Sequence, residues 1–217
     1  MRSRVPLGIT LALAALVGLL PTCDSGPSGD EASMPIRGGR LISTPDMDGW
    51  QHTGEGGFDV TVEDGRAVYT SRGGLGLLWY EEPLDDFELA LRLQVAEART
   101  NSGVFLRVPD PSDPAYISRS FEVQIDTGGE GTAATGAIFD VQSPIAAAPL
   151  APGVWHRMDI RAVGPRVQVW IDGVVVNDFL AHTGGEVSSY ELEGFVGLQN
   201  HSAADVVRFR DVRLRSV

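Results

Sequence analysis

Lysine is absent from this chain of 217 residues, in which all 17 basic residues are arginine. Without a lysine amine, Schiff-base catalysis through that group is excluded. Cysteine occurs once, as Cys23 near the amino terminus, so no intrachain disulfide, thiolate zinc cluster or iron–sulfur site can form. Basic residues are also outnumbered: the formal net charge is −12 and no basic stripe is visible in the sequence, which argues against a nucleic-acid partner.

The amino terminus has the pattern of an export signal. Arg2 and Arg4 precede a mainly apolar run over residues 5–20, which is short for a membrane span. Leu20 lies three residues before Cys23, and this spacing resembles a bacterial lipoprotein signal with Cys23 as the lipidated residue. A plain signal peptide with an incidental cysteine is the alternative. We therefore expect a signal over residues 1–23 and a flexible tether over 24–38. The protein would be exported to the periplasm or cell surface, with a lipid anchor as its only membrane contact.

Residues 39–217 are expected to form one all-β domain. Apolar residues alternate with polar ones over 87–95, which indicates a half-buried strand. Asp64-Gly65 and Asp172-Gly173 each separate two β-branched runs, which is the strongest short signal for a hairpin. Further strands are expected at 75–79, 136–139, 156–162 and 206–214, and no long amphipathic helix is apparent. The sequence therefore predicts a two-sheet jelly-roll β-sandwich of about a dozen strands.

Polar residues occupy one face of three predicted strands. Because successive side chains of a strand point to opposite faces, Val104 and Leu106 should enter the core. The expected outward set is Asn101, Phe105, Arg107, Glu122, Gln124, Asp126, Gln199 and His201. Such a face suits a polyhydroxylated ligand, with Phe105 as the aromatic that stacks on a sugar ring. Asp126 precedes Thr127-Gly128-Gly129, where an aspartate often only shapes a turn. The large aromatics Trp50, Trp79 and Trp155 are expected in the core.

These pieces together resemble the 3-keto-disaccharide hydrolase family, long known as a bacterial domain of unknown function. The matching stretches run in family order from about residue 40 to the carboxy terminus: Asn101-Ser102-Gly103-Val104-Phe105-Leu106-Arg107, Phe121-Glu122-Val123-Gln124-Ile125-Asp126, Thr135-Gly136-Ala137-Ile138-Phe139, Trp155, Ile171-Asp172-Gly173, Gly197-Leu198-Gln199-Asn200-His201 and Val207-Arg208-Phe209-Arg210-Asp211-Val212. The resemblance implies a concanavalin A-like jelly roll of the lectin and glucanase type. It also implies cleavage of 3-keto-glucosides or 3-keto-disaccharides. A non-catalytic, lectin-like carbohydrate-binding module on the same fold is the alternative.

Cleavage beside a 3-ketone requires a base, an acid and a stabilised enolate. Arg107 is expected to stabilise the enolate, Glu122 or Asp126 to act as the base, and His201 to act as the acid or its partner. The Cα atoms of Glu122 and Asp126 should lie about 13 Å apart at about 3.3 Å per residue. That separation exceeds the roughly 5–9.5 Å of paired glycosidase carboxylates, so the base and acid should come from different strands.

Substrate binding is assigned to the remaining polar-face residues, namely Asn101, Phe105, Gln124, Asp126 and Gln199. The sequence requires no cofactor and shows no metal motif, although loop carboxylates leave a divalent ion such as calcium open. The expected partner is a carbohydrate, and an upstream sugar 3-dehydrogenase would supply the ketone.

Overall fold

The computed structural model describes residues 35–181 and 190–217 of the chain. The predicted signal segment and Cys23 lie outside these residues, so the signal, the lipid anchor and the export of the protein stay predictions. Within the predicted tether, Ile36 is only 3% exposed and its carbonyl accepts a 2.6 Å hydrogen bond from Arg157 Nη2. In the described part of the chain, no helix is long and apolar enough to cross a membrane.

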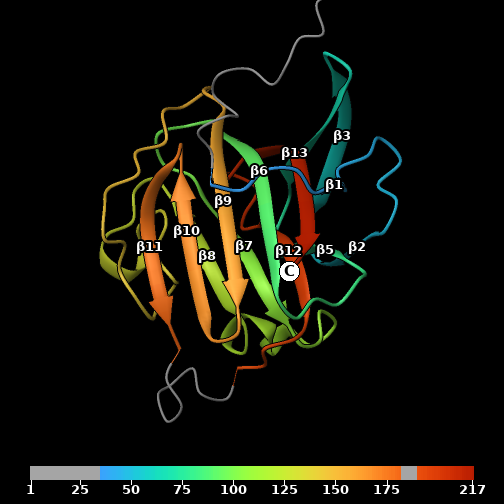
Figure 1. Cartoon of the computed structure of the whole chain (residues 1–217). Coiled ribbons are helices and arrows are strands. Elements are labelled where there is room, and N and C mark those ends of the chain that lie inside the picture. The colour runs from blue at the N-terminus through green and yellow to red at the C-terminus, as the bar shows by residue number, and fades with distance from the viewer. Residues whose placement is uncertain (1–34, 182–189) are drawn as a thin grey trace, which may run out of the picture. The chain divides into compact units, whose positions relative to one another are not determined.

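Two antiparallel sheets packed face to face make up the described residues (Figure 1). The larger sheet runs in the order β11 (Val174–Leu180), β10 (Arg166–Ile171), β9 (His156–Val163), β6 (Phe87–Val95), β13 (Val207–Ser216), β4 (Arg66–Arg72) and β3 (Gly57–Glu63), with β1 (Arg40–Leu41) paired to β13. The smaller sheet runs in the order β2 (Trp50–Gly54), β5 (Gly76–Tyr80), β12 (Phe195–Asn200), β7 (Asn101–Val108) and β8 (Phe121–Asp126). The predicted all-β, two-sheet sandwich is confirmed.

Both Asp-Gly pairs form the hairpin turns that the sequence predicts. Asp64 and Gly65 have φ values of 50° and 74°, and Asp172 and Gly173 have values of 49° and 80°. Two successive residues at positive φ match the twist of the flanking strands, and aspartate and glycine tolerate that conformation best. These turns join β3 to β4 and β10 to β11, and the β10–β11 pair has one register shift between Val169 and Trp170.

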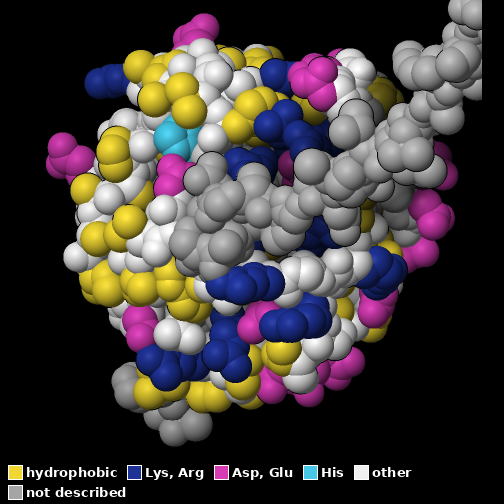
Figure 2. Space-filling view, turned by 45° about the horizontal axis from the view of Figure 1, so that its top comes forward, with side chains coloured by type: hydrophobic (Ala, Val, Ile, Leu, Met, Phe, Trp, Pro, Cys, Tyr) yellow, Lys and Arg dark blue, Asp and Glu magenta, His cyan; other side chains and the backbone are white. Residues whose placement is uncertain are grey.

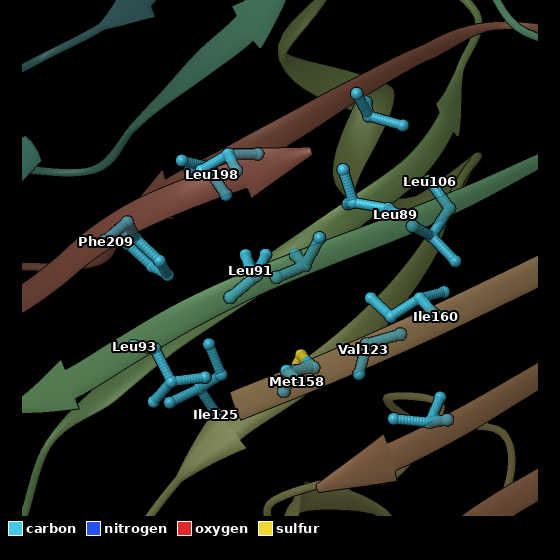
Figure 3. Close-up of a cluster of buried hydrophobic side chains, with 14 of the residues drawn as sticks. Leu89, Leu91, Leu93, Leu106, Val123, Ile125, Met158, Ile160, Leu198 and Phe209 are labelled. Atoms are coloured by element: carbon cyan, nitrogen blue, oxygen red, sulfur yellow. The ribbon is translucent and has the colours of Figure 1, made fainter. Parts of the chain in front are cut away.

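The main core lies between the sheets and is filled by the side chains of both sheets that point inward (Figure 3). The larger sheet contributes Leu89, Leu91 and Leu93 of β6, and the smaller sheet contributes Val104 and Leu106 of β7. All five side chains are 2% exposed or less. Burial of each such side chain contributes about 1.5–3 kcal/mol, so this layer is the principal source of stability.

A second apolar cluster covers part of the opposite face of the smaller sheet. It comprises Leu77, Phe105, Val108 and Tyr116. Tyr116 comes from the 3₁₀ helix η1 (Pro114–Ser118), which begins where the Asp113 carboxylate accepts a 2.9 Å hydrogen bond from Ala115 N. The segment that carries η1 therefore buries an outward-facing surface, and Phe105 is fully buried. The prediction of Phe105 as an exposed sugar-stacking residue is wrong, although its face of the strand is as expected.

Residues 136–139 do not form the predicted strand, because only Ile138 makes isolated bridges. The segment nevertheless lies along the edge of β8. Its backbone joins Glu122 through a 2.9 Å bond from Phe139 N to Glu122 O, and Gln124 through bonds of 3.0 and 2.8 Å. These bonds occupy edge groups that would otherwise be unpaired, and they fix the backbone that carries Glu122 and Gln124.

Replacement of Leu91 by alanine tests the core. Leu91 is 2% exposed, so Leu91→Ala should lower the free energy of unfolding by about 2–5 kcal/mol in urea titrations. Leu180→Ala on β11 is the matched control, because Leu180 is 47% exposed and should change stability by less than about 0.5 kcal/mol. Equal losses in the two variants would contradict this placement of the core.

Candidate active site

The polar residues of three strands share the outer face of the smaller sheet, as the alternation predicts. In the strand register Phe105 lies opposite Glu122, and Gly103 lies opposite Gln124. On the other side of β7, Gly197 lies opposite Phe105 and Leu198 opposite Val104, which places Gln199 beside Gly103. Gly103 is therefore flanked by Gln124 and Gln199 in one row across three strands.

Gly103 makes room for the carboxyl group of Glu122. A Cβ atom built on Gly103 would lie 2.0 Å from Glu122 Oε1 and 2.7 Å from its carboxyl carbon. No real side chain tolerates such a contact, so the Glu122 side chain leans across β7 through the space that glycine leaves. The carboxyl group thereby enters the row that contains Gln124 and Gln199.

Glu122 is buried without a charge to balance it. The residue is 5% exposed, and its carboxyl group makes no hydrogen bond or ion pair with any residue that the structure describes. Burial raises the pKa of Glu122 to about 8. The carboxyl group is thus mainly protonated at neutral pH and can donate a hydrogen bond or a proton. A carboxyl kept neutral by an apolar surrounding is a recurring source of acid catalysis.

Tyr116 is a neighbour whose pKa depends on the Glu122 carboxyl group. Burial and, to a smaller extent, the charge of Glu122 together raise the pKa of the Tyr116 phenol to about 12. Both groups therefore hold their protons at neutral pH, and the η1 segment contributes an uncharged wall beside Glu122.

Two buried amide oxygens in the same row have no partner. Gln124 and Gln199 are 2% and 4% exposed, and the Oε1 atom of each is buried without a hydrogen bond from any residue that the structure describes. Gln124 Nε2 donates to Asn101 Oδ1 over 3.4 Å. Unpaired buried acceptors are rare in folded proteins and mark places where a donor is missing. Sugar hydroxyls would supply such donors, so the predicted positions of Asn101, Gln124 and Gln199 fit substrate binding.

A polar cavity of about 280 Å³ adjoins this row at the ends of the strands. It is lined by Arg99, Thr100, Asn101, Asp126, Gly128, His201 and Asp205. Asn101 belongs both to this lining and to the hydrogen bond with Gln124. The cavity is therefore the open side of the polar face.

His201 and Asp205 form a hydrogen-bonded pair in that cavity. His201 Nδ1 lies 2.7 Å from Asp205 Oδ2, and Asp205 Oδ1 accepts a 2.8 Å bond from Asn101 N. Burial raises the pKa of Asp205, but hydrogen bonds from Ser202, His201 and the Asn101 amide outweigh it and hold the pKa below its usual value. The Asp205 carboxylate thereby orients the ring of His201 through Nδ1 and leaves Nε2 free of this contact. Sequence reasoning missed Asp205, although its position four residues after His201 was a usable signal.

Arg107 does not lie on the polar face, and its predicted outward position is wrong. The side chain is fully buried, and its guanidinium group donates to Gly164 O over 2.6 Å and to Asp85 O over 3.0 and 3.3 Å. A β-bulge explains the change: Arg107 has φ of 56°, and the register between β7 and β12 shifts at this point. The expected role of Arg107 in stabilising an enolate required the outward position, so the buried side chain does not support that role.

Trp79 and Phe195 are the aromatic residues that sequence reasoning missed on this face. Trp79 lies opposite Gly197 in the register, and its ring centroid is 5.0 Å from that of Phe195. Both are half-buried and pack against the second apolar cluster. Trp50 lies in the main core as predicted, whereas Trp79 does not.

Asp126 has the predicted turn role and also lines the cavity. Its Oδ1 accepts a 2.8 Å bond from Gly128 N, which shapes the turn after β8. Among the described residues, no three His, Cys, Asp or Glu side chains gather as metal ligands would. The need for calcium or another divalent ion stays an untested alternative.

The antiparallel sandwich with this polar face defines the class of the protein as a carbohydrate-active β-sandwich domain. The chain belongs to the family of 3-keto-alpha-glucoside-1,2-lyase-like domains, which it matches over residues 40–215. This confirms the family that the sequence motifs indicate.

Solved structures show the same fold at low sequence identity. A "putative glycosyl hydrolase" of Parabacteroides distasonis is 20% identical with a TM-score of 0.69, and the match covers 83% of this chain and 100% of that one. A second such protein from that organism is 19% identical with a TM-score of 0.64, covering 79% and 89%. The carbohydrate-binding module CBM66 of Bacillus subtilis is 18% identical with a TM-score of 0.56, covering 77% and 96%. No curated protein matches the sequence.

Substitution of Glu122 by glutamine tests its burial through stability. The pKa of Glu122 is raised, so the native state binds more protons than the unfolded state between about pH 4.5 and 8. The native protein therefore has its full unfolding free energy below pH 4.5, where Glu122 is protonated in both states, and loses part of it as the pH rises toward 8. The unfolding free energy of Glu122→Gln minus that of the native protein should therefore be about 3–5 kcal/mol larger at pH 9 than at pH 5. Urea titrations at the two pH values measure this gain. Glu130→Gln, at an exposed glutamate, should show no such gain, and a pH-independent difference for Glu122→Gln would contradict the burial.

Proposed function

We propose that this domain cleaves 3-keto-glucosides by removing the hydrogen on carbon 2 and releasing the aglycone from carbon 1. The observation that carries the proposal is the Glu122 carboxyl group, buried over Gly103 with a pKa of about 8 beside two unpaired amide oxygens. A structural face of a sheet gains nothing from such a group, since burying a carboxyl without a partner costs stability. The family supports a keto-glucoside as the substrate class.

The 3-ketone makes the chemistry feasible. It acidifies the hydrogen on carbon 2, so a base can take that proton and leave an enolate. When the enolate collapses, the bond from carbon 1 to the glycosidic oxygen breaks and a double bond forms between carbons 1 and 2. The departing oxygen needs a proton from an acid, and water can add to the double bond afterwards. The reaction is thus an elimination that hydration can complete as a net hydrolysis.

We assign the base to His201 and the acid to Glu122, which reverses the roles expected from sequence. His201 Nε2 is the acceptor of a ring held by Asp205, and Glu122 still carries its proton at neutral pH. Glu122 belongs to β8, and His201 directly follows the end of β12. Gly103 and Asn101 are two residues apart along β7, so their rows across the sheet lie about 7 Å apart. This distance leaves room for a sugar ring between the two rows.

Polar contacts to the sugar would come from the unpaired amides. The Oε1 atoms of Gln124 and Gln199 can accept hydrogen bonds from hydroxyl groups. With Arg107 buried elsewhere, the amide nitrogen of Gln199 is the donor that we assign to the ketone oxygen. Oxidation by a sugar 3-dehydrogenase would supply the ketone before the substrate reaches this protein.

Two substitutions and two leaving groups separate the acid from the base. On a 3-keto-disaccharide, Glu122→Gln and His201→Asn should each lower kcat about 10²–10⁴-fold. A nitrophenyl 3-keto-glucoside has a leaving group that needs no acid. On that substrate Glu122→Gln should stay within about tenfold of the native rate, whereas His201→Asn should remain impaired. Release of the aglycone is the measurement, and Glu130→Gln is the matched control.

Deuterium exchange gives a second readout of the same assignment. In heavy water, Glu122→Gln should still exchange the carbon-2 hydrogen of a 3-keto-disaccharide, because the base is intact, and His201→Asn should not. Native-like cleavage of the disaccharide by Glu122→Gln would refute the assignment of the acid. Binding of plain glycans by the native protein without turnover of any keto-sugar would favour the carbohydrate-binding module instead.

A further inference from the structure

Three arginines stand side by side on the outer face of the larger sheet, on the opposite side of the sandwich from the candidate active site. Arg157 of β9 lies opposite Arg92 of β6, and Arg92 lies opposite Arg210 of β13. Figure 2 shows arginine side chains gathered with a few carboxylates on the side of the molecule that faces the viewer. The sequence contains no basic stripe, so this row exists only through the register of the strands.

Like charges directly opposite each other destabilise a sheet, so each guanidinium group needs a counter-charge. Arg157 has one, because it makes three hydrogen bonds of 2.8–3.1 Å to Asp159. Arg92 and Arg210 have no such partner. They share the single carboxylate of Asp211 with Arg66 of β4, at distances of 3.8, 3.8 and 3.4 Å. None of these three arginines makes a side-chain hydrogen bond to a residue that the structure describes. We call Arg66, Arg92 and Arg210 the arginine cluster.

Arg210 is the least satisfied member of the cluster. Its Nε atom is buried and has no hydrogen-bond partner within the described part of the chain. Burial lowers the pKa of Arg210, and the charges of Arg66 and Arg92 act in the same direction, against the opposing carboxylates of Asp211 and Asp64. Its guanidinium carbon lies 4.1 Å from the centre of the Trp155 ring, which holds the group in place. Trp155, expected in the core from sequence, therefore serves as a platform on the outer face.

Arg208 shows that the same surface can satisfy an arginine. It lies two residues before Arg210 on the same face of β13, and its guanidinium carbon is 5.3 Å from the centre of the same ring. Unlike Arg210, it donates a 2.8 Å bond to Gln94 and a further bond to Glu63. The lack of hydrogen-bond partners is thus specific to the arginine cluster and is not shared by every arginine on this sheet.

We propose that the arginine cluster binds the phosphate group of a small phosphorylated ligand. The three guanidinium charges of the cluster exceed the two nearby carboxylates, Asp211 and Asp64, by one positive charge. A phosphate monoester carries about −1.5 to −2 at neutral pH, which is enough to neutralise that excess. Planar guanidinium groups donate paired hydrogen bonds to phosphate oxygens, and the buried Nε of Arg210 would gain its acceptor. The ligand reaches the cluster from the side of Arg66, whose side chain is 54% exposed.

Thermal unfolding of the whole protein with inorganic phosphate as the probe tests this proposal. At a phosphate concentration about five times the Kd, the Tm of the native protein should rise by about 2–4 °C, and above the Kd it should keep rising with the logarithm of the phosphate concentration. Arg210→Gln and Arg92→Gln should each weaken phosphate binding about tenfold or more. Arg166→Gln is the matched control on the same sheet, because Arg166 is already paired with Asp178 at 2.6 Å, and it should respond like the native protein.

Sodium chloride at equal ionic strength separates a site from general screening, and any rise that it gives should be the same in the native protein and in Arg210→Gln. Glucose 6-phosphate distinguishes the source of the phosphate: a Kd below that of inorganic phosphate supports a sugar phosphate, and an equal Kd supports recognition of the phosphate group alone. An equal rise in Arg210→Gln, or the same rise with chloride, would overturn the proposal. Because removal of one like charge relieves repulsion, Arg92→Gln should keep a native Tm without phosphate, so loss of folding does not confuse the result.

Discussion

The carboxyl group of Glu122 has been removed from water without a charge to balance it, and the site depends on that one constraint. Burial alone raises its pKa to about 8, far above the usual range of a glutamate. Three features maintain the burial: the empty position at Gly103, the wall formed by Tyr116, and the bonds that fix the backbone of Glu122 to Phe139. The fold therefore spends stability on keeping one acid protonated at neutral pH.

The candidate site has a buried part and a part that is open to solvent. Glu122, Gln124 and Gln199 lie in the buried row, where they are at most 5% exposed. His201, Asp126 and Asp205 line the open cavity, where Asp205 is ionised and orients the histidine ring. Different surroundings can give two titratable groups of one site different roles, and our assignment of Glu122 as the acid and His201 as the base rests on that difference. Asn101 connects the two parts through its bonds to Gln124 and Asp205.

Alternation along the strands was enough to predict which residues share a face, because that period is a property of the backbone. Val104 and Leu106 point into the core, and Glu122, Gln124 and Gln199 lie together on the other face. Alternation could not show what covers that face, so Phe105 was expected to be exposed although the segment with Tyr116 buries it. Nor could it anticipate the bulge at Arg107, where one residue at positive φ turns the side chain toward Asp85 and Gly164. The row of Arg157, Arg92 and Arg210 likewise needs the pairing of strands distant in sequence.

The most direct test of this account is the titration of the Glu122 carboxyl group itself. Carbon-13 NMR of the side-chain carboxyl carbons across pH 4–10 would follow it, and the resonance missing from Glu122→Gln would identify it. The account predicts a midpoint near the value of about 8 that burial produces, with the carboxyl protonated at pH 7. A midpoint close to the ordinary glutamate value of about 4.3 would contradict it, since Glu122 would then be ionised and unable to serve as the acid.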